Sequence, residues 1–210
     1  MSTRGAAIHR GVKLEYLTIG WNLLEGVVGL AAGVVAGSIA LVGFGIDSLI
    51  EISSGGILLW RLHADGDDEQ REAVEQREAV EHRALKLVGI TLLALAAYVA
   101  VESALSVAKH EAPDRSLPGI ALAIASLIAM PVLARAKRRV ASDLSSSAMR
   151  ADSWQSDICA YLAAILLVGL LLNAVLGWWW ADPAAGLVMT PIIAYDGMRA
   201  WQGKICDECQ

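Results

Sequence analysis

The sequence predicts an all-α membrane protein with six transmembrane helices. Of its 210 residues, 56% are hydrophobic and only 19% are charged, and the mean hydropathy is +0.51. A soluble domain of this length carries about a quarter charged residues. The charges gather in short blocks, and the apolar stretches between these blocks reach the roughly 20 residues that a bilayer crossing requires. We therefore expect a multi-pass protein with a single transmembrane domain over residues 1–210.

The six expected spans follow from the apolar runs. They lie roughly at residues 14–34, 38–60, 86–108, 117–134, 153–175 and 178–200. The link between the first two, Gly33 to Gly37, has room only for a tight hairpin. The third follows a segment rich in Glu, Arg and Ala, which are strong helix formers, so its helix is expected to extend into the cytoplasm.

The last two spans are separated by Trp178, Trp179 and Trp180, side chains that favour the membrane interface. Residues 201–210 are expected to form a short cytoplasmic tail that ends in a CxxC motif, Cys206 and Cys209.

The placement of Lys and Arg predicts the orientation. Six spans put both termini on one side of the membrane, together with the connections at 61–86 and 135–152. That side holds 15 of the 17 basic residues, and the opposite loops hold only Lys109 and Arg115. Because cytoplasmic loops are enriched in Lys and Arg, both termini are expected in the cytoplasm, with the protein in the cell membrane.

Several function classes are disfavoured. A net charge of −5 argues against a nucleic-acid partner, which would need a basic face. Residues 1–13 contain no apolar core with a small-residue cleavage site, so no cleaved signal peptide is expected. The spans show no HExxH motif and no paired nucleophile and base, which disfavours an enzyme. The sequence also lacks the GxxxxGK[ST] motif of ATP-binding proteins, which disfavours ATP as the energy source.

Acidic residues inside the expected spans are the main functional signal. They are Glu25, Asp47, Glu51, Glu102, Asp157, Asp182 and Asp196, and no Lys or Arg lies deep inside a span to neutralise them. An ionised side chain costs a few kcal/mol in the hydrocarbon, so these groups are expected to face a polar interior or a binding site. Uncompensated carboxylates attract a cation or a proton. In the other interpretation, they are protonated and form hydrogen bonds between helices.

Two pairs have the spacing of a shared helix face. Asp47 and Glu51 are four residues apart, and Ser153 and Asp157 repeat this spacing in the fifth span. If the two helices pack together, their oxygen atoms can surround a cation.

Three segments carry a resemblance to a known family. They are SIALVGFGIDSLIEISSGGILLWRL, RADSWQSDICAYLAAILLVGL and WWWADPAAGLVMTPIIAYDGMRAW. They resemble the second, fifth and sixth transmembrane helices of the cation diffusion facilitator (cation efflux) family. This resemblance implies a cation-efflux-type bundle that transports divalent metals, usually zinc, with relatives for manganese, iron, cobalt or nickel. It places Asp47 and Glu51 on the acidic pair of the second helix, and Ser153 and Asp157 on the His/Asp and Asp positions of the fifth.

The site departs from that pattern at one position. Ser153 stands where the family has a His or Asp, and all four histidines lie outside the spans. Zinc favours nitrogen and sulfur ligands, whereas an oxygen-only site suits harder ions such as manganese. Asp152 is a candidate for the missing carboxylate. Cys159 is expected to point away from the face of Asp157 and to pack in the core.

The resemblance also implies a cytoplasmic domain after the sixth helix, which we expect to be lacking here. Dimerisation would then depend on the membrane helices alone, and Cys206 and Cys209 would be either a metal contact or a plain tail. A second charged region, with His63, Asp65, Asp67, Asp68 and His82, is expected to be a solvated face, the alternative being a loose collector of metal ions.

Together these features predict proton-coupled efflux of zinc or a related divalent metal from the cytoplasm, with metal ions and protons as substrates and no resident cofactor. The alternative is a membrane subunit that senses metal or modulates a partner without transporting it.

Overall fold

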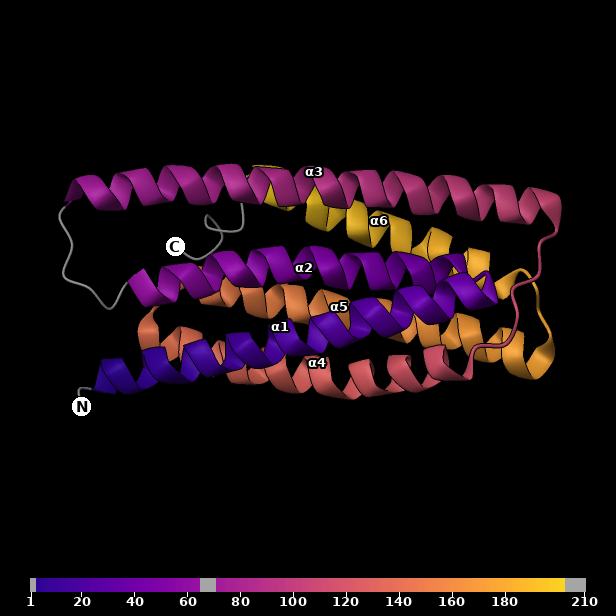
Figure 1. Cartoon of the computed structure of the whole chain (residues 1–210), viewed down its shortest axis with the longest axis horizontal. Helices are drawn as coiled ribbons and strands as arrows, with labels where there is room; N and C mark the ends of the chain where they lie inside the picture. Colours follow the sequence, from indigo (N-terminus) through magenta and orange to yellow (C-terminus); the bar gives the residue numbers. More distant parts are fainter. Residues whose placement is uncertain (1–2, 65–70, 203–210) are drawn as a thin grey trace.

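A computed structural model of the chain describes residues 3–64 and 71–202 (Figure 1). Within these ranges the fold is entirely helical, which confirms the predicted all-α class. The helices are α1 (Thr3–Ala36), α2 (Ile39–Ala64), α3 (Arg71–Lys109), α4 (Leu117–Leu144), α5 (Ser147–Leu171) with a π-helical end at Leu172–Leu176, and α6 (Ala181–Gln202).

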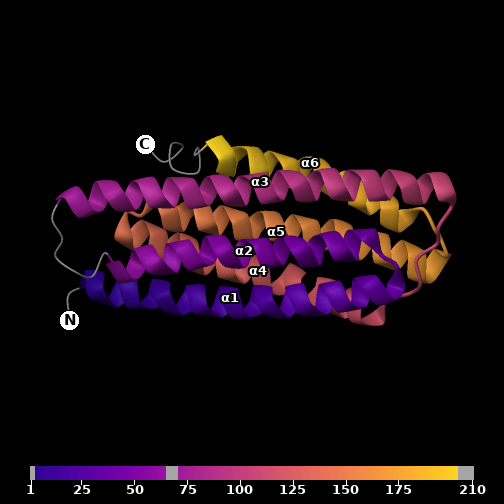
Figure 2. The same cartoon turned by 45° about the horizontal axis from the view of Figure 1, so that its top comes forward.

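The six helices run side by side in alternating directions (Figures 1 and 2). α1 begins and α6 ends at the same end of the bundle, as an even number of antiparallel helices requires. The closest pairs are α1 with α2, α3 with α6, and α4 with α5. α1, α2, α4 and α5 form a four-helix group, and the α3–α6 pair packs against its α2 and α5. Consequently α2 and α5, which carry the predicted site, lie in the middle of the bundle.

Five helical segments are long and apolar enough to cross a membrane. They are Gly5–Ala36, Ile39–Trp60, Arg83–Lys109, Leu117–Leu144 and Ala148–Leu176. α6 does not reach this threshold; it has 22 residues and includes Asp182, Asp196 and Arg199. It is nevertheless held in the bundle along α3, where a Cβ atom built on Gly197 would lie 3.0 Å from the Leu92 side chain.

α4 is longer than the span expected at 117–134. It begins at a Ser116 cap whose Oγ accepts a hydrogen bond from the Gly119 backbone N–H at 3.2 Å. It continues past Pro131 and ends only where Ser145 takes a left-handed conformation, with φ of 52°. These ten additional helical residues include Lys137, which is completely buried. The span expected at 117–134 therefore left out a buried basic residue.

Glycines allow α1 and α2 to approach closely. A Cβ atom on Gly29 would lie 3.1 Å from the Cα of Gly45, and one on Gly45 would lie 2.7 Å from the backbone nitrogen of Leu30. Such small-residue contacts let helix backbones touch in a membrane. The hairpin that joins the two helices turns at Gly37, whose φ of 67° suits glycine. The relative position of α1 and α2 is thus strongly constrained.

Some predictions fall outside the described residues. These are the charged loop with Asp65, Asp67 and Asp68, the side chains of His63 and His82, and the CxxC of Cys206 and Cys209. The tryptophan cluster is described: the rings of Trp178 and Trp180 stack with centroids 5.1 Å apart between α5 and α6.

Candidate metal-binding site

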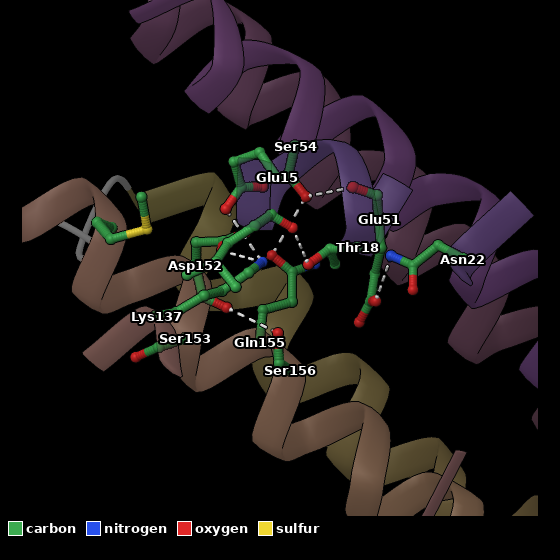
Figure 3. Close-up of polar contacts among 12 residues, drawn as sticks. Glu15, Thr18, Asn22, Glu51, Ser54, Lys137, Asp152, Ser153, Gln155 and Ser156 are labelled. Carbon is green, nitrogen blue, oxygen red and sulfur yellow. Dashed lines mark hydrogen bonds and ion pairs between the residues drawn. The ribbon is translucent and has the colours of Figure 1, made fainter. Parts of the chain in front are cut away.

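Asp47 and Glu51 lie one turn apart on α2, and both are buried, with exposed fractions of 4% and 6%. Glu51 accepts a hydrogen bond from Asn22 of α1, with 3.0 Å between Nδ2 and Oε2 (Figure 3). No Lys or Arg of the described ranges forms an ion pair with either carboxyl. The predicted pair is therefore present as two buried acids without a direct ion pair in the described ranges, although Lys137 acts electrostatically on Glu51 from a longer distance.

Two further acids extend this cluster. Glu25 of α1 and Asp196 of α6 both interact electrostatically with Asp47 and with Glu51. Four carboxyl groups from three helices thus face one region of the bundle. Like charges in a low-dielectric interior repel strongly, so these carboxyls must either hold protons or, when they ionise, be offset by cations.

Glu25 is the most fully hydrogen-bonded member of the cluster. Its carboxyl accepts from the indole N–H of Trp21 and from the hydroxyls of Ser48 on α2 and Ser126 on α4. The thiol of Cys159 on α5 donates to the same carboxyl, with 3.8 Å between Sγ and Oε2. Glu25 therefore joins four helices and has the surroundings of a structural group. Cys159 is buried, as predicted, and its sulfur is already engaged.

The α5 residues of the predicted site make contacts with other protein groups. The hydroxyl of Ser153, a residue with 1% exposure, donates to the backbone carbonyl of Arg150 at 2.6 Å. Asp157 is 19% exposed and forms an ion pair with Arg138 of α4, whose guanidinium contacts both carboxylate oxygens. In this conformation Arg138 provides the positive charge that a metal ion would otherwise offer to Asp157.

Asp152 takes part in a buried ion-pair network. The ammonium of Lys137 contacts Asp152, and it lies 3.2 Å from Oε1 of Glu15 on α1 (Figure 3). Lys137 and Glu15 are completely buried. Close by, α2 and α5 meet at a hydrogen bond of 3.2 Å from Ser54 Oγ to Gln155 Oε1. The network joins α1, α4 and α5 beside the carboxylate pair of α2.

Asp182 of α6 has a capping role. It accepts hydrogen bonds from the Ser38 hydroxyl and, at 2.9 Å, from the backbone N–H of Ile39, the first residue of α2. A carboxylate at a helix N-terminus satisfies free N–H groups and the helix dipole. Asp182 is therefore a structural residue that caps α2, at the end of the bundle away from the chain termini.

Comparison with known proteins identifies the fold family. Residues 16–201 match the cation efflux transmembrane domain. The chain belongs to the cation efflux family. The chain is also similar to a Synechocystis sp. protein described as an uncharacterized transporter, with 29% identity over 174 residues. The match covers 81% of the chain and 55% of that relative, so the chain spans about half the length of the curated protein it matches.

The structure does not bring all the predicted ligands into one cluster. In the described part of this cation efflux protein, no three His, Cys, Asp or Glu side chains converge closely enough to hold a metal ion. Asp47 and Glu51 form no ion pair within the described ranges, whereas Asp157 and Asp152 are each paired with a basic residue of α4. Whether the α5 residues bind metal stays a prediction for another conformation of the bundle.

Sequence reasoning missed a polar stripe on α1. Glu15, Thr18, Asn22 and Glu25 are spaced three, four and three residues apart, so they share one face of the helix. All four are buried, with exposures of 5% or less. The spacing was visible in the sequence, and a search for polar residues at helical period would have found it. The basic partners Lys137 and Arg138 were missed because the fourth span was ended too early.

Proposed function

We propose that this protein is a divalent metal cation carrier that exports zinc or a related ion, such as manganese, cobalt, iron or nickel, in exchange for protons. The observation that carries this proposal is the buried pair of Asp47 and Glu51, with no ion-pair partner in the described chain. Uncompensated buried carboxylates are costly unless a cation or proton joins them. Membership of the cation efflux family supports a metal as that cation.

The metal would bind between α2 and α5. Asp47 and Glu51 provide the permanent half of the site, and Asp157 with Ser153 provides the half that becomes available when Arg138 releases Asp157. Asp152 would add a carboxylate only if Lys137 moved away. Metal and protons compete for the same carboxylates, so proton entry from outside can expel the bound metal. This competition couples efflux to the proton gradient.

The proposed orientation places both termini in the cytoplasm, because 15 of the 17 Lys and Arg residues lie on that side of the six-helix topology. We also propose a homodimer whose contacts are made by membrane helices. Crosslinking of the protein in native membranes tests the dimer, and labelling of single cysteines introduced in the loops tests the orientation.

Metal flux in proteoliposomes with an imposed pH gradient tests the function directly. Zinc, manganese, cobalt, iron and nickel are compared for the wild type, Asp47→Asn and Asp114→Asn, where Asp114 is an exposed acid of the α3–α4 loop. We expect flux that follows the gradient in the wild type and in Asp114→Asn, and none in Asp47→Asn. Folded protein that moves none of these ions would disprove transport and favour a sensing role.

A further inference from the structure

Asn22 of α1 is a buried polar residue that the proposed transport site does not use. Its exposed fraction is 2%, and its Nδ2 donates to Glu51 at 3.0 Å. That hydrogen bond fixes which way the amide faces. Its Oδ1 has no hydrogen-bond partner in the described residues. A buried acceptor without a donor is destabilising, and a bound cation would satisfy it.

The position of this oxygen is set by rigid packing. Asn22 lies one turn before Gly26, where a Cβ atom would come within 2.4 Å of the Leu49 side chain, and two turns before the Gly29–Gly45 contact. α1 and α2 therefore cannot shift apart or slide without losing close contacts. In Figure 3 the amide of Asn22 lies against the carboxyl of Glu51, with its nitrogen turned towards that carboxyl. Asn22 and Glu51 thus form one preorganised unit.

Other potential ligands nearby are engaged. Asp157 is held by Arg138, and the thiol of Cys159 donates to Glu25. His110 lies away from Glu51, at the end of the bundle where α3 stops, and its ring contacts that of Trp179 in a tilted arrangement with centroids 4.8 Å apart. The side-chain atoms next to Glu51 that are available to bind a metal ion are therefore oxygen atoms.

We infer that Asn22 is a ligand of the transported cation. Its Oδ1 adds an oxygen ligand from α1 to the half of the proposed site that Asp47 and Glu51 provide. Carboxylate and amide oxygens suit hard divalent cations such as Mn²⁺. This inference rests on the proposed function, because it assigns a further ligand to the same site.

Calorimetric titration of the purified protein with Mn²⁺ in detergent tests the inference. Asn22→Leu removes the oxygen at similar volume, and Asn22→Asp keeps an oxygen but replaces the N–H donor by a second acceptor. The matched control is Thr18→Val, one turn away on α1, because the Thr18 hydroxyl is already bonded to the Leu14 backbone carbonyl at 2.9 Å. Thermal midpoints of all variants verify that they are folded.

If Oδ1 binds the cation, Asn22→Leu raises the Kd for Mn²⁺ about tenfold or more. Asn22→Asp then lowers the Kd, because the ligand gains charge. Thr18→Val leaves the Kd unchanged. If Asn22 only orients Glu51 through its N–H, Asn22→Asp weakens binding as Asn22→Leu does, and that result overturns the inference.

Asp47→Asn separates this inference from the proposed function. Binding that Asp47→Asn abolishes but Asn22→Leu leaves intact would reject Asn22 as a ligand while keeping the carrier. Wild-type protein that binds neither Mn²⁺ nor Zn²⁺ would reject both.

Discussion

Replacing Lys137 by Met is expected to destabilise the bundle more than any other single loss of charge. The ammonium of Lys137 contacts Asp152 and lies 3.2 Å from Glu15 in a region closed to solvent. Both oxygens of Glu15 lack a well-aligned hydrogen bond within the described chain. Glu15 therefore depends on the charge of Lys137, and its removal leaves two carboxyls facing each other without a cation.

The size of the effect follows from burial. Removing one partner of a buried ion pair costs about 3–5 kcal/mol. The pair of Lys109 and Glu111 is 3.6 Å apart and exposed, at 59% and 61%, and exposed pairs contribute only about 0–1 kcal/mol. In a chain of this length, 1 kcal/mol shifts the thermal midpoint by about 2–4 °C. Lys137→Met should therefore lower the midpoint by about 6–20 °C, and Lys109→Met by no more than about 4 °C.

Thermal unfolding of the purified protein in one detergent, followed by circular dichroism or a thiol-reactive dye, measures these shifts. The triple variant Glu15→Gln, Lys137→Met, Asp152→Asn should recover most of the loss, since an entire buried ion-pair network can be replaced at little cost. If Lys137→Met were as stable as Lys109→Met, the network would be hydrated, and the reasoning from burial would be refuted.

Three other substitutions test separate features. Arg138→Gln should free Asp157 and tighten zinc or manganese binding about fivefold in calorimetry, because a partly exposed ion pair is worth about 1 kcal/mol. Binding that is not tightened would show that Asp157 is not a ligand. Asp182→Ala should lower the thermal midpoint by about 2–8 °C through loss of the α2 cap, and an unchanged midpoint would mean that water replaces it. Gly45→Ala should cost about 1–3 kcal/mol in unfolding free energy, because its Cβ would lie 2.7 Å from the α1 backbone. Gly56→Ala, with nothing within 4 Å, is its matched control, and equal stabilities would contradict close α1–α2 packing.

The all-α class and the family could be predicted because they depend on local and periodic properties. A span needs about 20 apolar residues whatever its neighbours are, and the DSLIE and QSD segments lie within one helix each. The pairing of Asp47 with Glu51 on one face also needs only helical geometry, and the structure confirms that both are buried. The polar stripe on α1 depends on the same helical spacing and is equally readable from the sequence.

Helix ends were predicted less well because they depend on single contacts. The fourth span was expected to end at 134, where basic residues begin, since isolated charges do not enter a membrane. The helix continues to Leu144, and its Lys137 is buried against Glu15 and Asp152, two carboxylates from other helices. Composition alone does not show a partner such as Glu15, which is more than a hundred residues away from Lys137 in the chain.

By itself, the sequence determined that this chain forms a helical membrane domain of the cation efflux family and which acids its helices carry. Only the tertiary structure decided which acids have a direct partner: Asp157 and Asp152 are paired with basic residues of α4, Asp182 caps the start of α2, and Asp47 and Glu51 form no ion pair in the described ranges. The physical reason is that the cost of a buried charge depends on the partner that packing places within a few ångströms. That placement is a property of helix contacts and not of any one helix.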